Sequence, residues 1–76
     1  MNFEMKRLKD PTLTRVIQEY ALEHHPVEVN EGAVIEFDTA KLYSYIASKY
    51  YEMGYNCKAT ETDTLIQKIG QENNEI

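Results

Sequence analysis

A chain of 76 residues has room for one domain, and at this length it buries only about 60–65% of the surface exposed when it is unfolded. The single cysteine, Cys57, excludes an internal disulfide, and the adjacent His24 and His25 cannot complete a four-ligand zinc site with it. No apolar run reaches the roughly 18 residues of a membrane span. The first six residues also lack the apolar stretch of a signal peptide, so we expect a cytoplasmic protein without a membrane partner.

The net charge of −5 is unevenly distributed along the chain. Residues 16–40 contain six acids and no lysine or arginine, whereas four basic residues lie within the first fifteen: Lys6, Arg7, Lys9 and Arg15. The acidic block argues against a general nucleic-acid binder, because phosphate binding depends on clustered basic side chains. Heavy use of Asn, Ile, Lys and Tyr is typical of A+T-rich genomes, such as those of low-GC bacteria and their phages.

The first nine residues predict a weak edge strand or an arm that packs on the domain, because Phe3 and Met5 alternate with polar neighbours. Asp10 and Pro11 then form a typical helix start. Apolar residues follow at helical spacing until His25-Pro26, which predicts a helix over residues 11–24. On this helix His24 would lie at the rim of the core.

The segment after this helix predicts two strands. Residues 27–29 alternate, residues 33–37 are mostly apolar, and Asn30-Glu31-Gly32 between them favours a turn. A short β-hairpin is the simplest interpretation, and one continuous strand with a bulge near Gly32 is the alternative.

A second helix is predicted over residues 40–53, with Asp38-Thr39 at its start and Gly54 as its C-terminal cap. Alternation over residues 55–60 and 64–69, around a turn at Thr62-Asp63, predicts a second hairpin. The predicted order is therefore (β)-α-β-β-α-β-β. This is a single α+β domain over residues 1–70, with an antiparallel sheet of about four strands, both helices on one face, and a disordered tail over residues 71–76.

The helix over residues 40–53 is apolar or aromatic around more than half of its circumference. Such a helix is usually buried on two sides, so one interpretation places it between the sheet and the first helix. The other is that Tyr43, Ala47 and Tyr51, each one turn from the next, face a protein partner, since tyrosine combines a large rigid ring with a polar tip.

The helix over residues 11–24 adds a second candidate surface. Leu22 lies opposite its apolar stripe, beside Glu19 and Glu23. These acids would keep the chain soluble or attract the basic surface of a partner.

No pattern of catalytic, metal-binding or cofactor-binding residues is present, and we expect Cys57 to be a small buried residue of a strand. The sequence therefore favours a non-enzymatic protein–protein interaction module, such as a small regulator or inhibitor from a phage or mobile element. One alternative is a nucleic-acid-associated regulator that uses Lys6, Arg7, Lys9 and Arg15, with Phe3 stacking on a base. The other is a structural homodimer.

Overall fold

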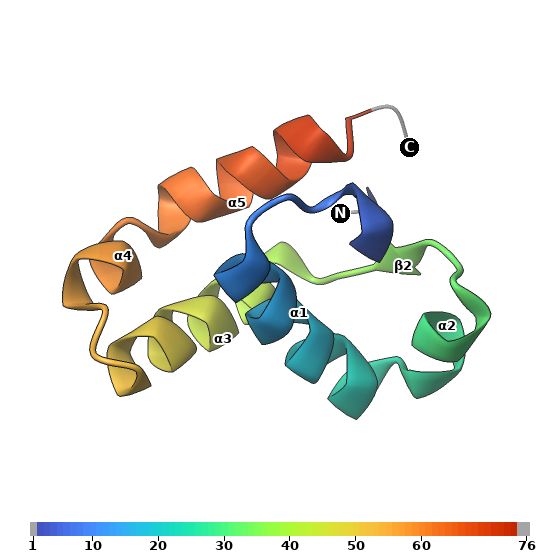
Figure 1. Cartoon of the computed structure of the whole chain (residues 1–76), viewed down its shortest axis with the longest axis horizontal. Helices are drawn as coiled ribbons and strands as arrows, with labels where there is room; N and C mark the ends of the chain where they lie inside the picture. Colours follow the sequence, from blue (N-terminus) through green and yellow to red (C-terminus); the bar gives the residue numbers. More distant parts are fainter. Residues whose placement is uncertain (1, 75–76) are drawn as a thin grey trace.

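The computed structural model describes residues 2–74, and within them the chain is mainly helical (Figure 1). Strand β1 (Asn2–Phe3) and a short 3-10 helix, η1 (Met5–Arg7), lead into α1 (Pro11–His24) and α2 (Pro26–Glu31). Strand β2 (Ile35–Glu36) then precedes α3 (Thr39–Glu52), α4 (Asn56–Thr60) and α5 (Thr62–Glu72). None of the helices in residues 2–74 has the length and apolar character needed to cross a bilayer.

The predicted α+β fold with a four-stranded sheet is wrong. Within the described residues the sheet has two strands, β1 and β2, which pair antiparallel with Phe3 opposite Ile35. The arm expected at the N-terminus is thus a strand over two residues, and the strand predicted at 33–37 is limited to Ile35–Glu36. The segments predicted as strands at 27–29 and 64–69 lie in helices, as does the segment 55–60 apart from Tyr55. Both predicted hairpins are absent from residues 2–74.

Local signals explain why these segments are helical. Pro26 occupies the first turn of α2, and Gly32 follows α2 with a φ of +67°, the left-handed conformation that commonly ends a helix. In α5 the side chains that face the core include Leu65, Ile66 and Ile69, and Ile69 lies one helical turn after the other two. Gln67, which a strand would have placed on the same face as Leu65, is exposed.

The two long helices are confirmed. The carboxylate of Asp10 caps α1, accepting hydrogen bonds from the amides of Thr12 at 3.0 Å and Leu13 at 3.2 Å. Asp38 caps α3 in the same way, and Gly54 follows α3 with a φ of +83°. The helices therefore begin and end where their sequence signals indicate.

The hydrophobic core lies where α1, α3 and α5 meet the two short strands. Phe3 from β1 and Phe37 after β2 pack with their ring centroids 5.3 Å apart. The buried apolar side chains are those of Phe3, Leu13, Val16, Ile17, Tyr20, Ala21, Ile35, Phe37, Leu42, Ile46, Tyr50, Leu65 and Ile69. Every long helix contributes to this core, so the fold depends on contacts between helices more than on the sheet.

Segments from opposite ends of the chain are joined directly. The amide of Glu4 donates a hydrogen bond to Oδ1 of Asn73 at 2.9 Å, and Nδ2 of Asn73 donates to the carbonyl of Ile69 at 3.1 Å. Within the segment 71–76, which the sequence predicts to be a disordered tail, Gln71 and Glu72 belong to α5 and Asn73 is buried. Residues 75 and 76, the last part of that expected tail, lie outside the described residues.

Candidate interaction surface

Helix α3 has two different faces. Leu42, Ile46 and Tyr50 on its inner face have no exposed surface, whereas Tyr43 and Tyr51 on its outer face are 39% and 70% exposed. Ala47 between them is partly buried. Burial of the helix on two sides, one of the two interpretations of the sequence, therefore does not extend to Tyr43 and Tyr51. That a protein partner binds these two tyrosines stays a prediction.

Small side chains separate the exposed tyrosines. The outer side of α3 also carries short side chains, those of Ala40, Ser44, Ala47 and Ser48. The surface of the helix therefore protrudes less there than at the two tyrosines. We use the name α3 face for the surface formed by Ala40, Tyr43, Ser44, Ala47, Ser48 and Tyr51. Small residues on a helix surface allow another helix to approach closely.

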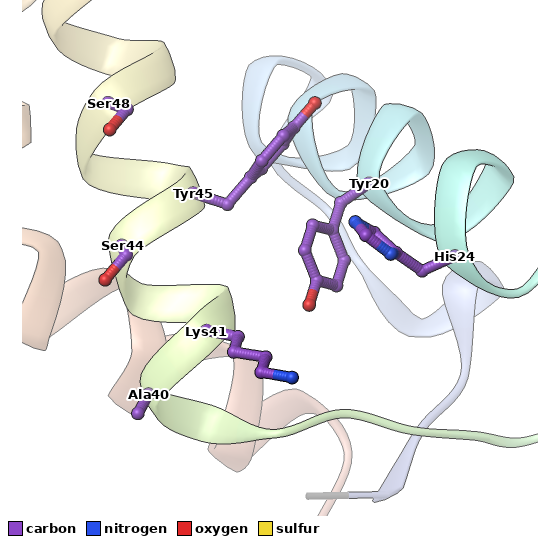
Figure 2. A pocket seen from close by; sticks show the side chains of 7 residues that line it. All are labelled: Tyr20, His24, Ala40, Lys41, Ser44, Tyr45 and Ser48. Atoms are coloured by element: carbon purple, nitrogen blue, oxygen red, sulfur yellow. The ribbon is translucent and has the colours of Figure 1, made fainter.

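A groove between α1 and α3 borders the first half of this face. It has a volume of about 550 Å³ and is lined by Tyr20, His24, Ala40, Lys41, Ser44, Tyr45 and Ser48. Figure 2 shows Tyr45 and Tyr20 lying between the two helices, while Ala40, Ser44 and Ser48 project from α3 on the side away from α1. The ring centroids of Tyr20 and Tyr45 are 4.9 Å apart, and His24 packs 4.5 Å from Tyr20. This α1–α3 groove is therefore open to solvent, and aromatic side chains form one of its sides.

A second groove borders the other half of the α3 face. It lies between α3 and α4, has a volume of about 450 Å³, and is lined by Ala47, Ser48, Tyr51, Glu52, Ala59 and Thr60. Ser48 lines both grooves, so the two hollows meet on the outer side of α3. Two of the candidates taken from the sequence, Ala47 and Tyr51, thus lie in a concave part of the surface.

Acidic side chains surround the aromatic side of the α1–α3 groove. Burial raises the pKa of Tyr45, and the negative charges of Glu19 and Glu23 raise it further, against the opposing effect of Lys49. Burial also raises the pKa of Tyr20, with smaller contributions from Asp38 and Glu23. Both hydroxyls therefore stay protonated at neutral pH and can donate hydrogen bonds.

The three candidates on α1 are exposed and do not line the α1–α3 groove. Leu22 is 45% exposed, and Glu19 and Glu23 are exposed beside it. Glu19 lies 3.7 Å from Nε of Arg15 and 4.0 Å from Nζ of Lys49, so part of its charge is compensated within the chain.

The basic N-terminal residues are mostly paired with acids. Lys6 and Arg7 both bind the carboxylate of Glu4, at 3.0 and 2.9 Å, and the hydrogen bond from Arg7, followed by that from Lys6, lowers the pKa of Glu4. Lys9 is exposed on the loop before α1, and Arg15 lies beside Glu19 as described above. Phe3, expected to stack on a base if this segment binds nucleic acid, is instead fully buried in the core.

The remaining candidates are placed on the surface. His24 is exposed against Tyr20, and Nδ1 of His25 lies 4.0 Å from Glu28. Residues 2–74 contain no group of three or more His, Cys, Asp or Glu side chains that could hold a metal ion. Cys57 is exposed on α4, so the expectation that it is buried in a strand is wrong.

Comparison of this chain with protein-family models, curated proteins and solved structures found no match. The sequence predicts Tyr43, Ala47 and Tyr51 as interface candidates but gives no sign of the groove beside them. That groove depends on the packing of Tyr20 against Tyr45. The periodicity of each helix predicts that its own tyrosine points inward, but it does not predict that the two tyrosines meet.

Proposed function

We propose that this chain is a non-enzymatic protein–protein interaction module that binds its partner through the α3 face. The observation that carries the proposal is the exposure of Tyr51, at 70%, in a concave surface that it lines together with Glu52 and four small side chains. Tyrosines in such positions are typical of the residues that contribute most to protein interfaces.

The electrostatics support a partner with basic groups at the edge of the contact. Glu19 and Glu23 are exposed on α1, the helix that forms one wall of the groove, and Leu22 beside them is 45% exposed. Charges at the rim of an interface raise the association rate and the selectivity more than the affinity. The α3 face would therefore supply the binding energy, and the acids of α1 would favour a partner of complementary charge.

Affinity capture with the purified chain as bait, in an extract of the cells that produce it, tests this function. We expect the native chain to retain a protein, a second copy of the chain included, and Tyr51→Ala to reduce the retained amount at least tenfold, as for a central interface tyrosine. Val27→Ala is the matched control, because Val27 is 62% exposed but lies on α2, away from α3 (Figure 1). Equal capture by native chain and Tyr51→Ala would contradict the proposal, provided that circular dichroism shows both to be folded.

A further inference from the structure

We infer that the protein partner inserts an arginine side chain beside Glu36 and Asp38, in a hollow that continues the α1–α3 groove. This acidic hollow has a volume of about 360 Å³ and is lined by Tyr20, His24, His25, Glu36, Asp38 and Lys41. Tyr20, His24 and Lys41 also line the α1–α3 groove, so the two are continuous. The inference rests on the proposed function for the presence of a protein partner, and it adds a contact that lies outside the α3 face.

The backbone places both carboxylates of the acidic hollow on the outer side of the chain. Glu36 is the last residue of β2, and Asp38 keeps an extended backbone with φ −72° and ψ 114°. Side chains of an extended segment alternate in direction, and Phe37 between the two acids is buried in the core. Glu36 and Asp38 therefore share the exposed side, with their Cα atoms about 7 Å apart.

The charges of these two acids are little compensated within the chain. Neither Glu36 nor Asp38 forms an ion pair within residues 2–74. Oδ1 of Asp38 accepts hydrogen bonds from the amides of Ala40 and Lys41, at 3.0 and 3.3 Å, and Oδ2 accepts none from the described residues. Lys41 lines the hollow without pairing with either acid. A cation that enters the hollow would therefore meet two carboxylates opposed by one lysine.

A second observation is a hydroxyl group without a partner, on a buried side chain that lines the same hollow. Tyr20 is only 6% exposed, and its hydroxyl forms no hydrogen bond within residues 2–74. Figure 2 shows the ring extending from α1 with the hydroxyl toward Lys41, and with His24 beside it. Unpaired polar groups on buried side chains are uncommon, and a hydroxyl oxygen can accept a hydrogen bond. A cationic N–H donor in the hollow would satisfy this group.

The electrostatic potential at this hydroxyl is negative. Burial raises the pKa of Tyr20, and the charges of Asp38 and Glu23 raise it further. Negative charges have this effect because they disfavour the phenolate form of the ring. The same field attracts a positively charged group and disfavours an anion such as a nucleic-acid phosphate.

The aromatic rings of the hollow favour arginine over lysine. The ring centroids of His24 and Tyr20 are 4.5 Å apart, and His25 packs edge-on against Phe37 at 5.6 Å. A planar guanidinium stacks on such rings while its five N–H groups reach several acceptors at once. An ammonium group is compact and more strongly hydrated, so it gains less from aromatic surfaces. The acceptors available to a guanidinium here are two carboxylates and the Tyr20 hydroxyl.

The probe for this site is Nα-acetyl-arginine amide, added to the isotopically labelled chain at constant ionic strength and followed by NMR. We expect saturable shifts of the backbone amides of residues 35–41, with a dissociation constant in the millimolar range. The uncharged isostere Nα-acetyl-citrulline amide should bind roughly tenfold more weakly, and Nα-acetyl-lysine amide about threefold more weakly. An arginine probe that does not bind, or binds no better than the citrulline probe, would overturn the inference. Equal binding of the lysine probe would overturn the choice of arginine.

Substitutions locate the site. Asp38→Asn keeps the cap of α3 and Glu36→Gln keeps the side-chain length, and each should weaken binding about threefold, or about tenfold together. Tyr20→Phe should also weaken it about threefold, because the hydroxyl acceptor is lost. Lys41→Gln should strengthen it about twofold, since a repelling charge is removed. Glu61→Gln is the matched control, because Glu61 is exposed but does not line the hollow. Weaker binding by Lys41→Gln, or an equal loss in the control, would place the arginine elsewhere.

The outcomes separate this inference from the proposed function. Tyr51→Ala should bind the arginine probe like the native chain, because Tyr51 does not line the acidic hollow. If the probe does not bind but Tyr51→Ala still loses protein capture, the inference is wrong and the proposed function stands. If the probe binds but Tyr51→Ala captures as much protein as the native chain, the reverse holds.

Protein capture also tests whether the arginine belongs to the partner. The double variant Glu36→Gln and Asp38→Asn should retain about tenfold less protein than the native chain, as it does for the probe. Unchanged capture by this variant would overturn the assignment of the arginine to the protein partner.

Discussion

Replacement of Asp10 is the sharpest test of how the fold is held together. Its carboxylate caps α1 through the amides of Thr12 and Leu13, and it also lies 3.4 Å from Nζ of Lys68 in α5. One side chain thus caps the start of α1 and also links this helix to α5, the last helix that contributes to the core. Asp10→Ala removes both contacts, whereas Asp10→Asn keeps the cap and removes only the charge.

The two contacts give different expected losses. An N-terminal cap contributes about 1 kcal/mol. The ion pair adds about 0.5 kcal/mol, a value discounted because the side chain of Lys68 is 43% exposed. Asp10→Ala should therefore lower the free energy of unfolding by about 1.5 kcal/mol, and Asp10→Asn by about 0.5 kcal/mol. Asp38→Ala removes a cap that forms no ion pair within residues 2–74, and it should fall between them at about 1 kcal/mol.

The pH dependence has a definite sign. Burial by itself would raise the pKa of Asp10, but hydrogen bonds from Leu13 and Thr12 and the charge of Lys68 outweigh it and lower the pKa below 3.8. A lowered pKa adds stability above the pKa of the unfolded state, and this stability is lost as the pH falls through the pKa of the folded state. The difference between the native chain and Asp10→Asn should therefore be full at neutral pH and shrink below pH 3.8.

Urea unfolding followed by circular dichroism, repeated from neutral to acidic pH, measures these differences. Lys68→Gln should lose the same 0.5 kcal/mol or so as Asp10→Asn, and the double variant should lose little more than either one. The reasoning would be refuted if Asp10→Asn were as destabilising as Asp10→Ala, or if its deficit grew in acid.

Three further substitutions test the interior. Tyr50→Phe should raise the free energy of unfolding by about 1 kcal/mol, because the buried Tyr50 hydroxyl has no hydrogen-bond partner in the described structure; a loss of stability would contradict this. Burial, with Asp10 and Tyr55 nearby, raises the pKa of Tyr50 from 10.0 to about 12, so the native chain should lose stability between these pH values and Tyr50→Phe should lose less. Phe3→Ala should lower the unfolding free energy by about 3–5 kcal/mol, which is a large share of what so short a chain has, and thermal melting would show it. Asn73→Ala removes the acceptor for the Glu4 amide and should lower stability by about 1–3 kcal/mol in urea, whereas a change within error would mean that water replaces this bond.

The parts of the fold that were predictable are those with signals close together in the sequence. Helix α1 has Asp10 and Pro11 at its start and Pro26 after its end, with apolar residues at helical spacing between them. Helix α3 has Asp38 and Gly54 in the equivalent places. In both helices the capping residues and the apolar periodicity indicate the same structure. Tertiary packing therefore does not override either signal.

The missed elements are short segments in which two periodicities overlap. Val27-Glu28-Val29 alternates like a strand, but three residues also fit one helical turn, and the exposure of Val27 shows that the two valines do not share a buried face. In α5 the pair Leu65 and Ile69 fits either period, whereas the partly buried Ile66 and the exposed Gln67 favour the helix. Contacts with α3 then decide the outcome, and a single sequence does not reveal them.

The candidate surface was predictable to a similar extent. Tyr43 and Tyr51 lie off the main apolar stripe of α3, which is why their exposure could be anticipated. The walls on either side could not be, because Tyr20 comes from α1 and Ala59 from a helix that was predicted as a strand. A groove between elements becomes visible only after the elements are packed.

The hydrogen bond between Glu4 and Asn73 has a consequence for how the molecule opens. The two residues are 69 positions apart, so this bond closes almost the whole chain into a single loop. Fraying of the first strand and fraying of the end of α5 are then the same event, since each frees the other's partner. Amide hydrogen exchange at Glu4 should consequently report on the joint release of both ends of the chain. Protection of this amide should fall when a substitution destabilises α5 far from Glu4, even though Glu4 lies in a segment with little regular structure.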